Sequence, residues 1–145
     1  MDLIVKSFRE LTTEELYEIL RTREAVFIVE QNCPYPEADG RDYDATHMYY
    51  RDEQGRVVAY LRLYEKKDEP GTLQIGRVVT SKRGVGLGRR ILHEGVTYAT
   101  ETLKARRLYL EAQVYAIGFY EKEGFSVTSA EVLEDGIPHV EMRKE

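Results

Sequence analysis

The chain has 145 residues, of which 42% are hydrophobic and 32% charged, and its formal net charge is −5. This composition is ordinary for a globular protein and argues against a disordered, fibrous or dedicated nucleic-acid-binding chain. The sequence has no apolar run near the roughly 20 residues needed to cross a bilayer, and it does not begin with a signal-peptide layout. We therefore expect one cytoplasmic domain over residues 1–145 with no membrane partner. A single cysteine, Cys33, cannot form an internal disulfide.

The first third of the chain predicts a strand, a helix and a loop. A strand is expected at residues 3–8, and Thr12 with Glu15 forms a capping box that opens a helix. The residues expected to face the core from this helix are Leu16, Ile19, Leu20, Val26 and Phe27. The helix must end near Cys33-Pro34-Tyr35-Pro36, because two prolines force extended backbone. A polar, acidic loop follows over residues 37–44.

The rest of the chain alternates strands and helices. Strands are expected at residues 48–51, 57–64, 72–79 and 108–112, and helices at 91–103 and 116–123. The last unit, residues 127–134 and 139–143, is predicted to be a hairpin because Asp135-Gly136 is a hairpin turn signal. This order predicts a mixed α/β sheet with a ligand site near its middle strands.

Residues 75–92 join a buried strand, a glycine-rich turn and the start of a helix. Glycine recurs at every second position, at Gly84, Gly86 and Gly88. Backbone N–H groups of such a turn can approach an anion closely. The nearby cations Arg83, Arg89 and Arg90 would oppose the helix dipole unless an anion is bound there. The segment therefore predicts a local phosphate site.

The spacing of this turn excludes two common phosphate loops. A Walker-type loop needs Gly-Lys-Ser/Thr, whereas Arg89 follows Gly88, and a dinucleotide fingerprint needs its third glycine one residue later. What remains is Arg83-x-x-Gly86-x-Gly88 between a strand and a helix. This pattern resembles the pyrophosphate loop of the GNAT superfamily of acyl-CoA-dependent N-acetyltransferases.

A second segment strengthens the resemblance. Residues 113–125 are similar to the GNAT pattern N-x-x-A-x-x-F/L-Y-x-x-x-G-F, with Gln113 in the place of the asparagine. In that family the segment places a tyrosine hydroxyl near the thioester sulfur, and the matching residue is Tyr120. The alternative is that Phe119, Tyr120 and Phe125 are only core aromatics at the end of a helix.

The first half and the end of the chain point to one branch of the family. Residues 23–42, His47 and residues 134–140 resemble the ElaA-like GNAT proteins, so the likeness covers essentially the whole chain. It implies a mixed, mostly antiparallel central sheet flanked by helices, and acetyl-CoA as co-substrate without a metal. The residues implied in cofactor binding are Val78, Val79, Arg83, Gly84, Val85, Gly86, Leu87, Gly88, Arg89, Gln113, Phe119 and Tyr120.

Acyl transfer from a thioester to an amine sets the remaining requirements. An amine of pKa about 10.4 must lose a proton at pH 7, which costs roughly 4.6 kcal/mol, so a base or a water chain must help. The base candidates are Glu30, Glu37, Asp39, Asp42, His47, Glu111 and His139. We assign catalysis to Tyr120 as general acid with Glu37 and His47. The residues expected to hold the acceptor are Glu30, Glu37, Asp39, Asp42 and His139.

Several alternatives stay open from the sequence. The acidic loop is equally typical of a solvated surface, and each histidine of a packing residue. The chain is otherwise interpretable as a catalytically silent acyl-CoA-binding module, or as a covalent acyltransferase with Cys33 as nucleophile, although Cys33 has no basic neighbour in sequence. Acyl-homoserine-lactone synthases share a similar fold and are the least favoured enzyme class. The acceptor is a small-molecule or peptide amine, and exposed strand edges are compatible with a homodimer.

Overall fold

The sheet forms the frame of the molecule. A computed structural model describes residues 1–33, 35–81 and 84–145, and its strand order is β1-β2-β3-β4-β5-β8-β6, with β7 also paired to β8. The strands are β1 (Ile4–Ser7), β2 (Thr46–Arg51), β3 (Val57–Glu65), β4 (Thr72–Thr80), β5 (Arg107–Gln113), β6 (Ser126–Val127), β7 (Val132–Glu134) and β8 (Ile137–Lys144). In the described residues β4 and β5 pair in parallel and the other neighbours are antiparallel. The expected mixed, mostly antiparallel sheet is confirmed.

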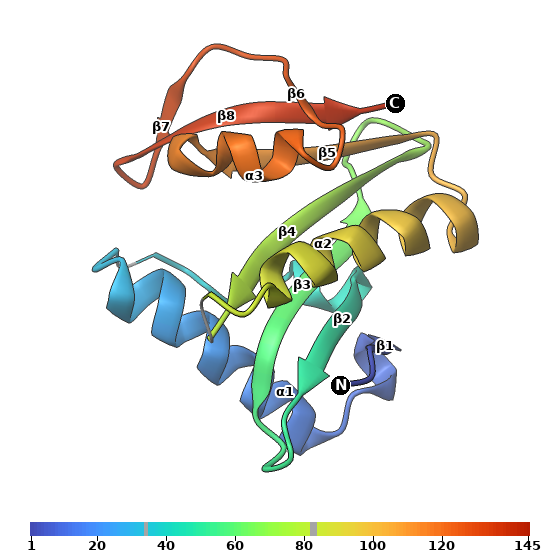
Figure 1. The fold of residues 1–145 in the computed structure, drawn as a ribbon, viewed down its shortest axis with the longest axis vertical. Helices are drawn as coiled ribbons and strands as arrows, with labels where there is room; N and C mark the ends of the chain where they lie inside the picture. Colours follow the sequence, from blue (N-terminus) through green and yellow to red (C-terminus); the bar gives the residue numbers. More distant parts are fainter. Residues whose placement is uncertain (34, 82–83) are drawn as a thin grey trace.

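Helices cover both faces of this sheet, and Figure 1 shows α1 and α2 on opposite sides of β3. The α-helices are α1 (Thr13–Arg23), α2 (Leu87–Thr97) and α3 (Ile117–Glu121). The other helical segments are η1 (Phe8–Glu10), η2 (Glu24–Glu30), η3 (Arg41–Asp44), η4 (Tyr98–Thr102) and η5 (Val114–Ala116), of which η2 and η4 have π-helical geometry. Among the described helices, none has the length and apolar character needed to span a bilayer.

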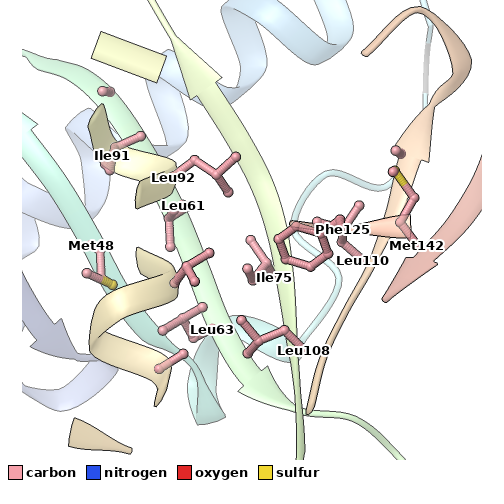
Figure 2. Close-up of a cluster of buried hydrophobic side chains, with 14 of the residues drawn as sticks. Met48, Leu61, Leu63, Ile75, Ile91, Leu92, Leu108, Leu110, Phe125 and Met142 are labelled. Carbon is pink, nitrogen blue, oxygen red and sulfur yellow. The ribbon is translucent and has the colours of Figure 1, made fainter. Parts of the chain in front are cut away.

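The main hydrophobic core lies between the sheet and α2. Figure 2 shows Leu61 and Leu63 of β3, Ile75 of β4, and Ile91 and Leu92 of α2 within this cluster. Successive side chains of a strand point to opposite faces, so the next residues of β3 face α1 instead. A smaller cluster on that face contains Ile19, Tyr49, Val57, Tyr60 and Val79.

Two predictions that depend on residues close together in the sequence are confirmed, a helix cap and a hairpin turn. The Thr12 hydroxyl accepts a hydrogen bond from the Glu15 amide at 3.1 Å, and the Glu15 carboxylate accepts one from the Thr12 amide at 2.9 Å, which completes the predicted capping box. Asp135 and Gly136 have φ values of +51° and +78° in the tight turn between β7 and β8. Such a turn needs left-handed backbone at both positions, which the Asp-Gly pair tolerates.

The expected apolar face of α1 is only partly right. The fully buried positions are Glu15, Ile19 and Arg23, at successive spacings of four, whereas the predicted apolar residues other than Ile19 are half-buried. The buried stripe therefore carries two ionisable groups that need partners inside the protein. The proline expected to help end this region, Pro34, lies outside the described residues.

Two other predicted elements are divided. The helix expected over residues 91–103 is α2 followed by η4, where the Thr100 hydroxyl donates to the Val96 carbonyl oxygen at 2.9 Å. Such side-chain bonds to the preceding turn often bend helices. The strand expected over residues 127–134 is β6 and β7, both on β8. Between them, Ser129 accepts a hydrogen bond from the Glu141 amide through its hydroxyl at 2.9 Å, which replaces regular strand pairing.

Candidate active site

The middle of the sheet opens where β4 leaves β5. These strands pair only over residues 72–74 and 107–109, and Figure 1 shows them diverging beyond that point. On its other side β4 contains a bulge, because Arg77 and Val78 together lie opposite Leu61, between the Arg62–Gly76 and Tyr60–Val79 pairs. A bulge leaves the extra residue outside the ladder and bends the strand.

Arg77 adopts an unusual backbone conformation at this bulge. Its φ is +54°, in the left-handed region, which costs a residue with a side chain about 1–2 kcal/mol. Glycine is the usual residue at such a bulge position. The backbone is therefore strained at Arg77, in the centre of the sheet.

A cavity of about 240 Å³ lies between the diverging strands. Its walls come from β4 and β5, from η2 and the loop after it, from α3, and from the β7–β8 turn. The predicted site residues that line it are Asp39, Val78, Gln113, Tyr120 and His139, together with Glu111 from the candidate bases. The structure therefore brings together residues far apart in the sequence on one small cavity.

Tyr120 presents a phenol to this cavity. Its ring packs edge-on against Phe119 and Phe125, with centroids 5.1 Å and 6.2 Å away. Its hydroxyl makes no hydrogen bond with another residue in the part of the chain that the structure describes. Burial raises the pKa of Tyr120, so the phenol keeps its proton at neutral pH. The group is available as a proton donor.

His139 faces the cavity with a defined tautomer. Its Nδ1 lies 2.7 Å from the Ile137 carbonyl oxygen and must donate to it, so a neutral ring carries its lone pair on Nε2. A Glu134 carboxylate oxygen lies 3.9 Å from Nε2. Burial raises the pKa of Glu134, and the neighbouring Glu111 carboxyl acts in the same direction. The cavity lining therefore contains the His139 imidazole, which can accept a proton, beside the carboxyl groups of Glu134 and Glu111.

Three acids of the acidic loop, Glu37, Asp39 and Asp42, pair with arginines. These acids alternate with the arginines in a closed circle of ion pairs, which we call the charge ring. The charge ring consists of Arg23, Glu37, Arg77, Asp39, Arg62 and Asp42, in that order. It connects α1, the loop before β2, β3 and β4. Three arginines balance three carboxylates, so the ring carries no net charge.

The ring lowers the pKa of two of its carboxylates, Asp39 and Asp42. Burial alone would raise the pKa of Asp39, but hydrogen bonds from Arg62 and from the Arg41 amide, with the charges of Arg62 and Arg77, lower it to about 2. Burial likewise opposes ionisation of Asp42, and the Arg23 and Arg62 guanidiniums lower its pKa. Glu37 and Asp42 are paired with arginines and lie outside the cavity lining, so we do not propose Glu37 as a base or either residue as an acceptor ligand. Asp39 is also paired with arginines but lines the cavity.

His47 is also unsuited to the catalytic role expected for it. The side chain is 0% exposed and does not line the cavity. Its Nδ1 lies 2.6 Å from the Tyr60 hydroxyl and its Nε2 lies 3.0 Å from the Asp42 carbonyl oxygen. Burial lowers the pKa of His47, which favours the neutral ring. His47 is a packed core residue, and Glu30, at the end of η2, is exposed and outside the cavity lining.

The glycine turn leads into the N-terminus of α2. Gly86 is the residue before the helix, with φ +78°, and Gly84 has φ +79°; a Cβ at either would meet nothing within 4 Å. Gly88 lies closer to its neighbours, because a Cβ there would be 3.4 Å from Thr80, an ordinary van der Waals distance. Gly86 offers no capping side chain to the first N–H groups of α2. This open end with free N–H groups suits an anion.

The arginines near the turn differ in their surroundings. Arg83 lies outside the described residues. Arg89 is exposed and makes no ion pair with another described residue, whereas Arg90 packs over Tyr50 and contacts Glu94 at 3.0 Å. Val79 points its buried side chain into the cluster around α1, so only its backbone is available to a ligand.

Sequence reasoning missed several residues that build the site. These are Arg23, Tyr35, Arg62, Arg77 and Glu134. One signal was present in the sequence, because Arg62 alternates with Tyr60 and Tyr64. In a β-strand this spacing puts the arginine on the same face as the two tyrosines. A buried arginine on that face required carboxylate partners, and the acidic loop supplies them.

Comparison with known proteins agrees with this architecture. Residues 12–145 match the family model described as an acetyltransferase (GNAT) domain. A UPF0039 protein of Schizosaccharomyces pombe is 40% identical over 148 residues, covering 100% of this chain and 97% of that protein. The protein ElaA of Escherichia coli is 35% identical over 139 residues, covering 94% of this chain and 91% of ElaA.

Solved structures give the same result. The crystal structure of an acyl-CoA N-acyltransferase from Pseudomonas aeruginosa is 37% identical and superposes with a TM-score of 0.92, covering 100% of both chains. The crystal structure of E. coli ElaA is 34% identical, with a TM-score of 0.92 over 99% of each chain. The chain therefore belongs to the GNAT acetyltransferase family and is a homologue of ElaA.

Proposed function

We propose that the protein transfers an acetyl group from acetyl-CoA to a primary amine by direct attack in a ternary complex. The single observation that carries the proposal is the unpartnered Tyr120 hydroxyl in the cavity where β4 leaves β5. A catalytically silent site would have no need of a half-buried proton donor at this position.

The residues present fit acetyl-CoA as co-substrate. Gly84 and Gly86 leave open space at the N-terminus of α2, where exposed N–H groups would hold the pyrophosphate, with Arg89 nearby. The pantetheine arm would then enter between β4 and β5, beside Val78 and Gln113. When bound, the thioester supplies an activated acetyl group.

Within this site we assign the base to His139 in place of Glu37 and His47. His139 Nε2 would take one proton from the acceptor ammonium, and the Glu134 carboxylate at 3.9 Å would stabilise the imidazolium. The amine nitrogen would then bond to the carbonyl carbon, and backbone N–H groups of the β4 bulge, which lines the cavity, would stabilise the oxyanion. As the carbon–sulfur bond breaks, Tyr120 gives its proton to sulfur, and the nitrogen releases its second proton to solvent.

The acceptor is a small-molecule or peptide amine. The cavity lining contains four carboxyl groups, those of Asp39, Glu111, Glu134 and Asp135, against three arginines, Arg41, Arg62 and Arg77. This balance favours a cationic acceptor.

A screen of amines with acetyl-CoA, read by thiol release, tests the proposal. Polyamines, amino sugars and peptides with free N-termini or lysines cover the classes, and at least one should release thiol above background. Acetyl-CoA binding without turnover on any amine would favour a silent acyl-CoA-binding module instead.

A further inference from the structure

Arg77 combines strained backbone with a side chain that is held on several sides. Its φ of +54° places it in a conformation where glycine is usual. The neighbouring glycine, Gly76, is one residue earlier and does not adopt this conformation. A Cβ at Gly76 would lie 3.4 Å from Arg62 Nε, which is an ordinary van der Waals distance. Because the strain lies at Arg77 itself, a contact from outside β4 can stabilise the bulge.

The charge ring provides that contact. Arg77 donates from Nε to a Glu37 carboxylate oxygen at 2.9 Å, and from Nη2 to the Glu37 carbonyl oxygen at 3.2 Å. It also reaches Asp39 at 3.4 Å and lies over the Tyr35 ring. The Tyr35 hydroxyl in turn donates to Glu37 at 2.7 Å. Arg77 is thus fixed to the loop before β2 by both charge and backbone contacts.

That loop is itself anchored in the core. Glu37 binds Arg23 of α1, which is 0% exposed, and Asp39 binds Arg62 of β3, which is 1% exposed. Asp42 joins the two buried arginines at 2.9 Å and 3.0 Å. Removal of the Arg77 side chain would therefore detach the bulge and leave the connection between α1 and β3 in place.

We propose that Arg77 is a positioning residue: through the charge ring it fixes the β4 bulge, whose residues 76–78 line the cavity proposed to hold the thioester. Arg77 touches no reacting atom in this role. The kinetic consequence rests on the proposed acetyl transfer, whereas the effect on the bulge itself does not.

Arg77→Gly is the direct test, because glycine accepts φ +54° without strain. We expect kcat to fall about 10–100-fold, since small displacements of reacting groups cost this much, while the KM for acetyl-CoA stays within about threefold. Amide hydrogen exchange at residues 77 and 78 should accelerate about tenfold or more. Arg77→Lys, which keeps the charge but loses the forked contact, should lie between this variant and the parent.

Two controls separate positioning from other effects. Lys104→Gly relieves a similar left-handed residue, with φ +58°, on an exposed loop, and should change neither kcat nor exchange at the bulge. Guanidinium added to Arg77→Gly can restore the charge balance but not the covalent link, so kcat should stay low.

Recovery of parental kcat with guanidinium would assign Arg77 to charge balance and overturn the proposal. Parental kcat or parental exchange in Arg77→Gly would overturn it too. If Arg77→Gly does not fold, kcat and amide exchange are measured on Arg77→Lys instead, and parental values of either would overturn the proposal. If the parent protein acetylates no amine, the proposed function fails, and hydrogen exchange still shows whether Arg77 fixes the bulge.

Discussion

Tyr120 is the residue on which the proposed chemistry depends most. Phenylalanine keeps the packing against Phe119 and Phe125 and removes only the hydroxyl. General acid catalysis is worth about 10²–10⁴-fold, but a thiolate leaves easily, so we expect Tyr120→Phe to lower kcat roughly 10–100-fold. The KM for acetyl-CoA should stay within about threefold. Steady-state kinetics with a saturating amine measures both constants.

The matched control for this variant is Tyr17→Phe. Tyr17 is 65% exposed on α1, lies outside the cavity lining, and should tolerate the change without kinetic effect. Unchanged turnover in Tyr120→Phe would show that water or another donor protonates the sulfur. Loss of acetyl-CoA binding in that variant would make Tyr120 a structural residue.

His139 carries a pH-dependent prediction. At pH 7 we expect His139→Asn to lower kcat/KM about 10²-fold or more, because the acceptor ammonium loses its base. An amine of pKa about 10.4 is roughly 100-fold more deprotonated at pH 9 than at pH 7, so the loss should shrink as the pH rises. The pH profile of kcat/KM for parent and variant checks this.

His93→Asn is the control for the histidine prediction. His93 is exposed on α2, 3.2 Å from Glu123, and does not line the cavity. Its replacement should leave the pH profile unchanged. A loss in His139→Asn that is equal at pH 7 and pH 9 would contradict a role as base and assign the residue to packing of the β7–β8 turn.

At the scale of elements, the glycine turn and α2 should act together as the cofactor loop. Acetyl-CoA at 100 times its dissociation constant contributes about 2.7 kcal/mol, which appears as thermal protection of the parent. Gly86→Glu should abolish that protection, because the side chain occupies the open space and adds negative charge at the helix N-terminus. Thermal unfolding with and without acetyl-CoA measures the difference.

Gly86→Ala separates charge from strain in this test. Both substitutions force a side chain onto a residue with φ +78°, so both should lower the unfolding temperature without ligand. Alanine should retain part of the acetyl-CoA protection, whereas glutamate should not. Normal acetyl-CoA binding by a folded Gly86→Glu protein would refute the pyrophosphate-loop assignment.

Elements specified by neighbouring residues were predictable from the sequence, and those specified across the fold were not. The Thr12–Glu15 capping box and the Asp135-Gly136 turn depend on contacts within a few residues, and both are confirmed. The bulge at Arg77 and the division between β6 and β7 depend on their partners β3 and β8. Residues of the partner strand are distant in sequence, so periodicity within one segment does not reveal them.

Across the whole molecule, family membership was readable because two contiguous motifs carry it, the glycine turn and residues 113–125. The charge ring was not, because its members come from four parts of the chain and each resembles a surface charge in isolation. The surroundings of the expected bases were hidden from the sequence for the same reason. Glu37 and His47 have suitable side chains, but burial and arginine partners decide their roles.

Acid stability tests whether buried carboxylates hold the parts of the molecule together. Glu15 joins α1 to β1 and β2 by accepting hydrogen bonds from Lys6 and Tyr49, each at 2.9 Å. Burial opposes its ionisation, but the Thr12 amide, Lys6 and Tyr49 lower its pKa to about 2. A pKa below the unfolded value near 4.5 stabilises the fold above that pH, and the stabilisation disappears as the pH falls toward 2.

We therefore expect the free energy of unfolding of the parent to fall between pH 4.5 and pH 2, with Glu15 contributing a slope of about 1.4 kcal/mol per pH unit. Glu15→Gln should be less stable at pH 7 and show a shallower fall. Glu14→Gln is the control, because that side chain is 78% exposed and its ion pair with Arg51 is on the surface. Urea unfolding at pH 7, 5, 3 and 2 measures all three proteins. An identical pH dependence in Glu15→Gln and the parent would show that Glu15 does not link protonation to unfolding.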